Sequence, residues 1–208
     1  MSSYAEIYDQ VWQDLRYDEY SPEFAILPHL ITWLEHHDAH SVLIVGCGSG
    51  RGLEALLRRG FDAYGLDCSA EAERLFRRRL ELTDYQVPAP TRGHPARFRV
   101  LDVLKWDARV LEQYDACICV DVLEHIAEWH VHQFIRRIAE VRAERYLFTA
   151  ANIPDAFGPL ITGKSLHFTV KPADWWEGAL SPLFIVERWR IPGERDWAAN
   201  FDCIRRRL

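Results

Sequence analysis

The stretch VLIVGCGSGRG, residues 42–52, joins a continuous aliphatic run to four glycines within its last seven residues. Glycine loses more backbone freedom on folding than any other residue, so such a cluster indicates that the backbone itself has a task. The aliphatic run predicts a buried strand over residues 41–46, and the residues after it predict a helix over 50–59 that ends at Gly60. The glycines therefore lie in a strand-to-helix loop, where bare N–H groups can approach a ligand.

Extended and helical patterns alternate along the rest of the chain. The early strands are continuously apolar, which indicates a parallel sheet covered on both faces, and the loop between the last two strands is too short for a crossover helix. We therefore expect an α/β fold, with a doubly wound, mostly parallel seven-stranded sheet, helices on both faces and an antiparallel edge hairpin. The other predicted strands are 61–67, 96–102, 114–121, 145–150, 183–191 and 201–208, and the other predicted helices are 21–37, 127–142, 172–180 and one capped by Ser69. In the first of these helices, Ser21 is the expected N-cap and Pro22 the first helical residue.

Length, charge and cysteine content narrow the class of protein. A chain of 208 residues suits one domain with a full core, and no run approaches the ~20 apolar residues of a membrane span. The N-terminus lacks the basic start and apolar block of a signal peptide, so a cytoplasmic protein is expected. The net charge of −6 disfavours a strongly electrostatic nucleic-acid binder. Five cysteines without a CxxC pair disfavour a disulfide framework or a zinc site.

The order of the glycines is specific. Gly46, Gly48 and Gly50 form G-x-G-x-G, and Arg51 stands where a dinucleotide-binding G-x-G-x-x-G would need its third glycine, which argues against a nicotinamide dehydrogenase. The spacing resembles the first motif of the class I S-adenosylmethionine-dependent methyltransferases. An acid after the second strand, the segment RVLDV at the end of the third and YDACICVDVLEH at the fourth follow in that family's order, so the resemblance covers about residues 40–150.

This resemblance implies S-adenosylmethionine as cofactor and a set of residues that bind it. In the family an acid at the position of Asp67 accepts hydrogen bonds from both ribose hydroxyls, an acid near that of Asp102 lies by the adenine amino group, and the end of the fourth strand lies beside the transferring methyl. Purely structural roles remain open as well, with Asp67 as an acid that flanks a helix and Asp102 as a turn residue. The implied cofactor-binding residues are Gly46, Cys47, Gly48, Gly50, Asp67, Cys68, Asp102, Val103 and Asp121.

The segment DVLEH, at the carboxyl end of the fourth predicted strand, indicates that His125 faces the acceptor. A histidine can take the proton of an alcohol or phenol, because its ordinary pKa lies near neutrality. The segment is similar to the E-x-x-E-H motif of ubiquinone-pathway O-methyltransferases and small-RNA 2′-O-methyltransferases, in which the acids and the histidine bind a divalent metal. The matching residues are Asp121, Glu124 and His125, with His167 as a possible later ligand. A metal site, a metal-free catalytic role for His125 and His167, and a purely structural contact all remain open.

The expected organisation is a single class I methyltransferase domain over residues 1–208. Residues 1–38 would form an N-terminal helical cover, 39–150 the cofactor-binding core, and 151–208 the acceptor-side loop, helix and edge strands. Aromatic residues in the cover and Trp175 or Trp176 either approach the pocket or simply pack. The loop-rich segment 152–170 is expected to lie over the acceptor pocket, and its sequence does not tell whether it moves.

The leading interpretation is a methyltransferase that acts on a small-molecule acceptor, at oxygen, without nucleic acid or membrane partners. One alternative is an RNA-end or protein methyltransferase with a divalent metal at Asp121, Glu124, His125 and His167. Another is a non-catalytic, methyltransferase-like subunit that binds the cofactor or a partner. The sequence names neither the acceptor nor the oligomeric state.

Overall fold

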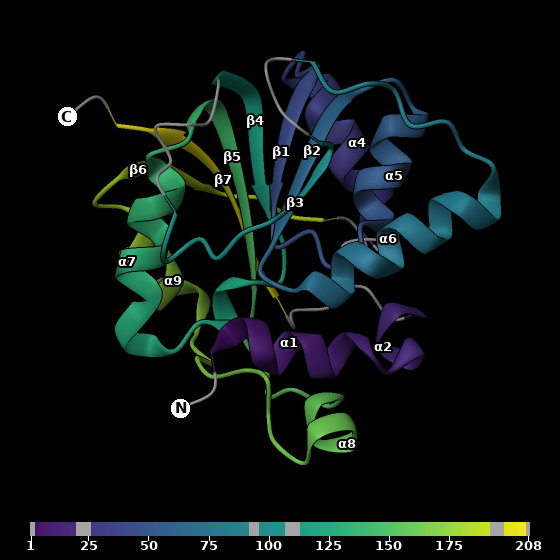
Figure 1. Cartoon of the computed structure of the whole chain (residues 1–208). Helices are drawn as coiled ribbons and strands as arrows, with labels where there is room; N and C mark the ends of the chain where they lie inside the picture. Colours follow the sequence, from purple (N-terminus) through teal and green to yellow (C-terminus); the bar gives the residue numbers. More distant parts are fainter. Residues whose placement is uncertain (1–2, 20–25, 92–95, 107–112, 192–197, 207–208) are drawn as a thin grey trace.

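A seven-stranded sheet organises the computed structural model, which describes residues 3–19, 26–91, 96–106, 113–191 and 198–206 (Figure 1). The strand order is β3-β2-β1-β4-β5-β7-β6, so the chain moves outward from β1 in one direction and then returns to start β4 on its other side. The strands are β1 Ser41–Val45, β2 Asp62–Asp67, β3 Phe98–Val100, β4 Gln113–Cys119, β5 Arg142–Ala151, β6 Phe184–Arg188 and β7 Ala198–Arg205. The reversal of direction beside β1 is the place where doubly wound folds leave a crevice.

Both faces of the sheet are covered, which explains why the central strands lack a polar side. In β1, Val42 and Ile44 pack into one hydrophobic core with α4, α5 and α6, whereas Leu43 and Val45 pack into the other with α7 and α9. Figure 1 shows these two helix layers on either side of the strands. The helices are α1 Tyr4–Trp12, α2 Leu15–Glu19, α4 Leu27–His36, α5 Arg51–Arg58, α6 Ala70–Thr83, the 3₁₀ turn η2 Leu123–His125, α7 Glu128–Ala139, α8 Gly158–Thr162 and α9 Ala173–Leu180.

The predicted α/β architecture is confirmed, including the antiparallel edge. The four inner pairings that involve β1 to β5 are parallel, whereas β7 pairs antiparallel with both β5 and β6. Ser69 caps α6 as predicted, because its hydroxyl accepts a hydrogen bond from the N–H of Ala72. Ser21 and Pro22, the expected cap of the helix before β1, lie outside the described residues.

Some boundaries differ from the sequence-based prediction. The third strand has only three residues, Phe98–Val100, and is shorter at both ends than the predicted range 96–102, whereas β5 is longer at its start than predicted. The short helix α8 was not predicted. Its sequence, GPLIT, contains glycine, proline and two β-branched residues, which are weak helix formers.

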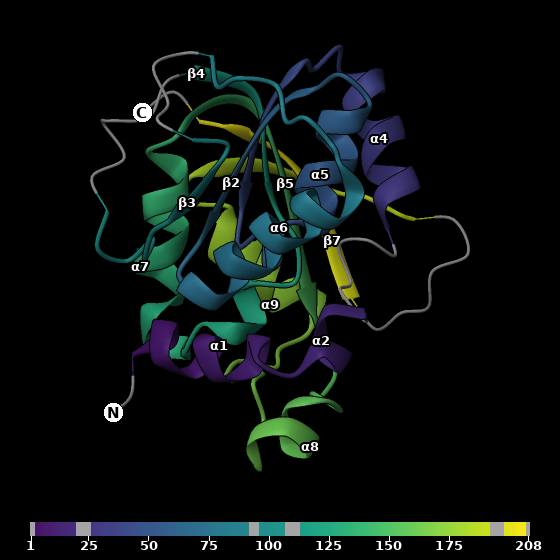
Figure 2. The ribbon, with the colours of Figure 1, turned by 45° about the vertical axis from the view of Figure 1, so that its right-hand side comes forward.

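The N-terminal helices lie across the edge of the sheet where the parallel strands end. Figures 1 and 2 both show α1 and α2 running beneath the strands, with α8 beyond them. Trp12, at the end of α1, lies against Gly48 of the glycine loop, which fixes that edge as the carboxyl edge of β1. Within the described part of the chain, no helix combines the length and apolar character needed to cross a bilayer.

Candidate active site

The glycine loop forms one wall of a pocket at the carboxyl edge of β1, β2 and β4. Gly46, Gly48 and Gly50 all have left-handed backbone angles, with φ of 72°, 52° and 74°. A Cβ on Gly48 would lie 2.7 Å from the ring of Trp12, and one on Gly50 would lie 2.6 Å from the ring of Phe76. Side chains are therefore excluded both by conformation and by space. Gly46 and Gly48 line the pocket, whereas Gly50 precedes α5 and lets α6 approach the loop.

Asp67 links the glycine loop to the end of β2. One carboxylate oxygen accepts the N–H of Gly48 at 2.9 Å, and the other accepts the N–H of Ser69 at 2.9 Å. Burial nevertheless raises the pKa of Asp67 to about 6, because desolvation outweighs these hydrogen bonds. A carboxylate has about four acceptor positions, so Asp67 keeps capacity for a ligand's hydroxyl groups. Cys47 and Cys68 lie on the same wall.

Asp102 and Asp121 also line this pocket, and each has local partners. Asp102 accepts the N–H of Leu104 at 3.0 Å and forms a 2.9 Å ion pair with Lys105. Asp121 has a left-handed φ of 50°. The hydroxyl of Thr149 accepts the N–H of Asp121 at 3.0 Å and donates to its carboxylate at 3.1 Å, so a neighbouring strand holds this conformation. Val103 lines the wall beside Asp102.

His125 ends the 3₁₀ turn after β4 and is buried in the pocket wall. Its Nδ1 lies 3.0 Å from the carbonyl oxygen of Leu166. Because a carbonyl only accepts, Nδ1 carries the proton in the neutral ring and Nε2 keeps its lone pair. Burial, with a contribution from His167, lowers the pKa of His125 to about 3. At neutral pH this imidazole is therefore neutral, and it is a weaker base than the ordinary pKa of histidine suggests.

His167 and Glu124 lie beside His125, although the sequence separates the two histidines widely. The ring centroids of His125 and His167 are 4.9 Å apart, and Nδ1 of His167 donates to the carbonyl oxygen of Ile153 at 2.8 Å. One ligand atom from each of Glu124, His125 and His167 lies within 4.8 Å of the others. Oε1 of Glu124 accepts the N–H of Ala151, whereas Oε2 is buried without a partner. Burial and the neighbouring Asp121 raise the pKa of Glu124 well above its ordinary value.

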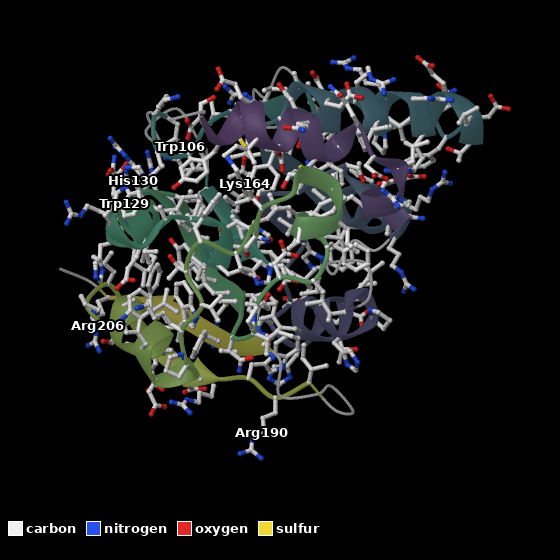
Figure 3. All side chains as sticks on the ribbon, turned by 90° about the horizontal axis from the view of Figure 1, so that it is seen from below. Trp106, Trp129, His130, Lys164, Arg190 and Arg206 are labelled. Carbon is white, nitrogen blue, oxygen red and sulfur yellow. The ribbon has the colours of Figure 1, made fainter. Side chains whose placement is uncertain are left out.

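The cover of the pocket contains the aromatic residues for which the sequence left open whether they approach the pocket or only pack. Tyr4, Tyr8 and Trp12 follow one another at intervals of four, which places them on one face of α1, and all three line the pocket together with Tyr17. That spacing was the available signal, and it indicates an apolar helix face without showing what the face covers. Figure 3 looks at this edge from below, with α8 and Lys164 in the middle of the view.

Polar contacts anchor this cover to the core. Asp9 of α1 accepts the hydroxyl of Ser69 at 2.6 Å and the N–H of Glu71 at 3.1 Å, at the start of α6. Asp18 of α2 forms a 2.9 Å ion pair with Arg79 of α6. These anchors hold α1 and α2 against α6 and its N-cap Ser69, which follows Asp67 by two residues.

The tryptophan pair of α9 does not reach the pocket. Trp176 is fully buried in the hydrophobic core between the sheet and the layer of α7 and α9. Trp175 lines a separate surface groove with Trp129, Phe168 and His132. The interpretation that these side chains cover the sheet holds for Trp176.

Comparisons with known proteins agree with this geometry. A family described as "Methyltransferase domain" matches residues 42–144. A ubiquinone biosynthesis O-methyltransferase of Acinetobacter baylyi is 28% identical over 121 residues, which are 56% of this chain and 47% of that protein. The corresponding protein of Erwinia tasmaniensis is 32% identical over 125 residues, 56% of this chain and 46% of that protein. These matches span about half the length of the relatives.

The fold has solved counterparts. The crystal structure of magnesium protoporphyrin IX methyltransferase from Synechocystis PCC 6803 with bound S-adenosylhomocysteine superposes with a TM-score of 0.65 at 22% identity. The superposition covers 88% of this chain and 82% of that one.

Proposed function

The chain belongs to the class I S-adenosylmethionine-dependent methyltransferases, and from this premise we propose that it transfers the methyl group of S-adenosylmethionine to an oxygen of a small-molecule acceptor. One observation carries the proposal. The glycine loop, Asp67 and the free Nε2 of His125 converge on one pocket at the carboxyl edge of the sheet. This pocket holds groups suited to a nucleoside at one end and a proton acceptor at the other.

In the proposed cofactor half, Gly46, Cys47 and Gly48 present backbone to the amino-acid part of the cofactor. Asp67 accepts hydrogen bonds from the ribose hydroxyls, with Cys68 beside it. Asp102 and Val103 border the adenine, and Asp121 borders the sulfonium end. Gly50 contributes indirectly, because it lets Phe76 and α6 close on the loop.

In the proposed reaction the acceptor oxygen attacks the methyl carbon in line with the carbon–sulfur bond. The new bond is carbon–oxygen, the electron pair of the broken bond stays on sulfur, and the hydroxyl proton leaves. Bond formation to the methyl carbon makes the oxygen cationic and its proton strongly acidic, so Nε2 of His125 accepts that proton despite the low pKa of the ring. His167 is the adjacent imidazole that receives it next, since it is the less buried of the two. Because the cofactor supplies an activated carbon, the chain's contribution is mainly alignment and proton removal.

The small-molecule acceptor is supported by the pocket and by the charge of the chain. The wall consists mostly of apolar and aromatic side chains with a few polar groups, as in sites for small ligands. The net charge of −6 disfavours a polyanionic substrate. Oxygen as the target is supported by the names of the two relatives, both O-methyltransferases.

A metal-dependent enzyme is the second candidate, because the residues present fit a divalent cation. The buried Oε2 of Glu124 lacks a partner among the described residues. One ligand atom from each of Glu124, His125 and His167 lies within 4.8 Å of the others. Glu124, His125 and His167 would hold the ion, which would lower the pKa of an acceptor hydroxyl when bound. Asp121 departs from the four-ligand set, because its carboxylate is engaged by Thr149.

The test is transfer of tritium from [methyl-³H]S-adenosylmethionine to catechol, a short RNA and a mixed protein extract, each with and without EDTA. Labelled, organic-extractable catechol ether that forms equally well with EDTA supports the first candidate. Label that enters RNA or protein, or that requires added Mg²⁺ or Mn²⁺, supports the alternatives. Cofactor binding without any transfer would favour a non-catalytic subunit.

A further inference from the structure

The hydroxyl of Tyr8, on the pocket cover, is buried and makes no hydrogen bond within the described part of the chain that would stabilise the fold. Among the described residues, Tyr8 contributes the one tyrosine hydroxyl that is both buried and without a hydrogen-bond partner. Leaving a buried polar group unpaired is unfavourable, so native proteins rarely keep one without reason. Tyr4, one turn earlier on α1, shows the usual outcome, since its hydroxyl accepts the N–H of Ala127 at 2.9 Å and contacts Nδ1 of His130 at 3.2 Å.

The Tyr8 hydroxyl belongs to a side chain in the pocket wall beside His125. The ring of Tyr8 meets the ring of His125 edge to face, with centroids 5.7 Å apart. Both residues line the same pocket. The hydroxyl is a donor, whereas the free Nε2 of His125 is an acceptor, because Nδ1 of that ring is committed to the carbonyl of Leu166. Two rings in contact in the pocket wall therefore supply a donor and an acceptor that are not hydrogen-bonded to each other.

We propose that Tyr8 donates a hydrogen bond to the oxygen that is methylated and thereby selects oxygen over nitrogen. The inference rests on the proposed function. A hydroxyl acceptor has one hydrogen and two lone pairs. Its hydrogen binds Nε2 of His125, one lone pair accepts the hydrogen bond of Tyr8, and the other lone pair faces the methyl carbon. The hydrogen and both lone pairs of the acceptor oxygen are then engaged, and the attacking lone pair is oriented towards the methyl carbon.

An amine acceptor does not fit the same three contacts. A neutral amine has a single lone pair, which the attack on the methyl carbon consumes, so it cannot also accept a hydrogen bond from Tyr8. An amine in this position leaves the hydroxyl of Tyr8 buried and unpaired, and sites that leave a buried polar group unpaired discriminate against such ligands. Tyr8 would thus determine which atom is methylated.

The experiment compares Tyr8→Phe with Tyr4→Phe, first without acceptor. Tyr8→Phe removes a hydroxyl that makes no hydrogen bond, so it should melt at or above the wild-type temperature and bind S-adenosylhomocysteine as the wild type does. Tyr4→Phe leaves the N–H of Ala127 unpaired and should melt about 3 °C lower. A melting temperature of Tyr8→Phe lowered to the same extent would make Tyr8 a structural residue and overturn the proposal. Weakened S-adenosylhomocysteine binding would instead place the hydroxyl on the cofactor and also overturn it.

The second arm uses 2-aminophenol, which offers oxygen and nitrogen on one ring. The wild type should give mainly the O-methyl product, and Tyr8→Phe should lower the ratio of O-methyl to N-methyl product about tenfold, the value of one hydrogen bond. An unchanged ratio with a wild-type level of O-methylation would overturn the role of Tyr8 alone. A wild-type protein that methylates neither atom of 2-aminophenol and fails with catechol would overturn the proposed function, and this inference with it.

Discussion

His125 and His167 cross edge to face with ring centroids 4.9 Å apart, and each donates its Nδ1 hydrogen to a backbone carbonyl, Leu166 for the first and Ile153 for the second. Residues from two distant segments are therefore fixed in the same tautomer. In both rings Nε2 is the nitrogen without the proton, and one ligand atom of each ring lies within 4.8 Å of a carboxylate oxygen of Glu124. This pair connects the turn after β4 to the segment after β5.

Replacement of His125 tests whether the pair acts on the acceptor. His125→Ala should lower turnover by at least about 100-fold, the usual contribution of a proton-transferring side chain, while the dissociation constant of S-adenosylhomocysteine changes by less than threefold. His40→Ala is the matched control, since that ring is 83% exposed and far from the pocket edge. Equal losses of turnover and cofactor affinity would make His125 part of the cofactor site instead.

Replacement of Asp67 tests the cofactor half. Asp67→Ala removes the carboxylate between Gly48 and Ser69, and with it the hydrogen bonds proposed for the ribose hydroxyls. Hydrogen bonds to a charged group contribute about 1.5–3 kcal/mol, so the affinity for S-adenosylhomocysteine should fall by about 10-fold or more. Calorimetry measures the change directly. An unchanged dissociation constant would remove Asp67 from the binding site.

The pKa of Asp67 gives this site a pH dependence. The Asp67 carboxyl is half protonated at a pH of about 6, and the proposed ribose contacts are strongest with the ionised form. Affinity for S-adenosylhomocysteine should be constant well above pH 6 and should fall towards tenfold per pH unit below it. The Asp67→Ala variant should show no such fall between pH 7 and 5. A wild-type affinity that is flat over that range would contradict the assignment of Asp67 to the ribose.

The same shift has a consequence for stability, with the opposite sign from an ordinary carboxylate. The folded-state pKa of about 6 lies above the unfolded value of about 3.9, so the folded protein binds this proton more tightly. The contribution of Asp67 to the free energy of unfolding therefore declines as the pH rises from about 4 to about 6. At neutral pH the buried charge of Asp67 therefore lowers the free energy of unfolding.

The glycine loop predicts a contrast between two substitutions to alanine. Gly48→Ala forces a side chain into a left-handed conformation and against the ring of Trp12, so it should lower the free energy of unfolding by at least about 1 kcal/mol and weaken S-adenosylhomocysteine binding. Gly178→Ala is the control, because that glycine lies in α9 with open space around it. This substitution should raise the free energy of unfolding by about 0.5–1 kcal/mol. Chemical denaturation measures both. A Gly48→Ala protein as stable as the wild type would show that the loop tolerates a side chain.

The sequence predicted the parts of this site that neighbouring residues determine. The apolar run before Gly46 and the acids Asp67, Asp102 and Asp121, at or just after the ends of β2, β3 and β4, are local patterns. Parallel strands bring their ends to one edge whatever the loops do. The approach of His167 to His125 and of Trp12 to Gly48 depends on how distant segments pack, which no local pattern records. The low pKa of His125 is a consequence of burial, which no local pattern shows, so the expectation of a near-neutral pKa was wrong.

Metal content and the effect of EDTA on turnover test whether the enzyme depends on a divalent metal. The metal-free account predicts that EDTA-treated protein keeps its turnover and that purified protein holds well under one equivalent of transition metal by mass spectrometry. His167→Ala is the informative variant, because it removes one of the three donors without touching the pocket wall lined by Asp67. Stoichiometric metal in the wild type that is lost in His167→Ala would establish the second candidate.

The measurement that tests the central claim most directly is calorimetric titration of the wild-type protein with S-adenosylhomocysteine, repeated with EDTA and with added Mg²⁺. The account predicts one site per chain with a dissociation constant in the micromolar range, about −8 kcal/mol, that is insensitive to both additions. Absence of binding would contradict the assignment of the glycine loop and Asp67 to this cofactor, and with it the proposed methyl transfer.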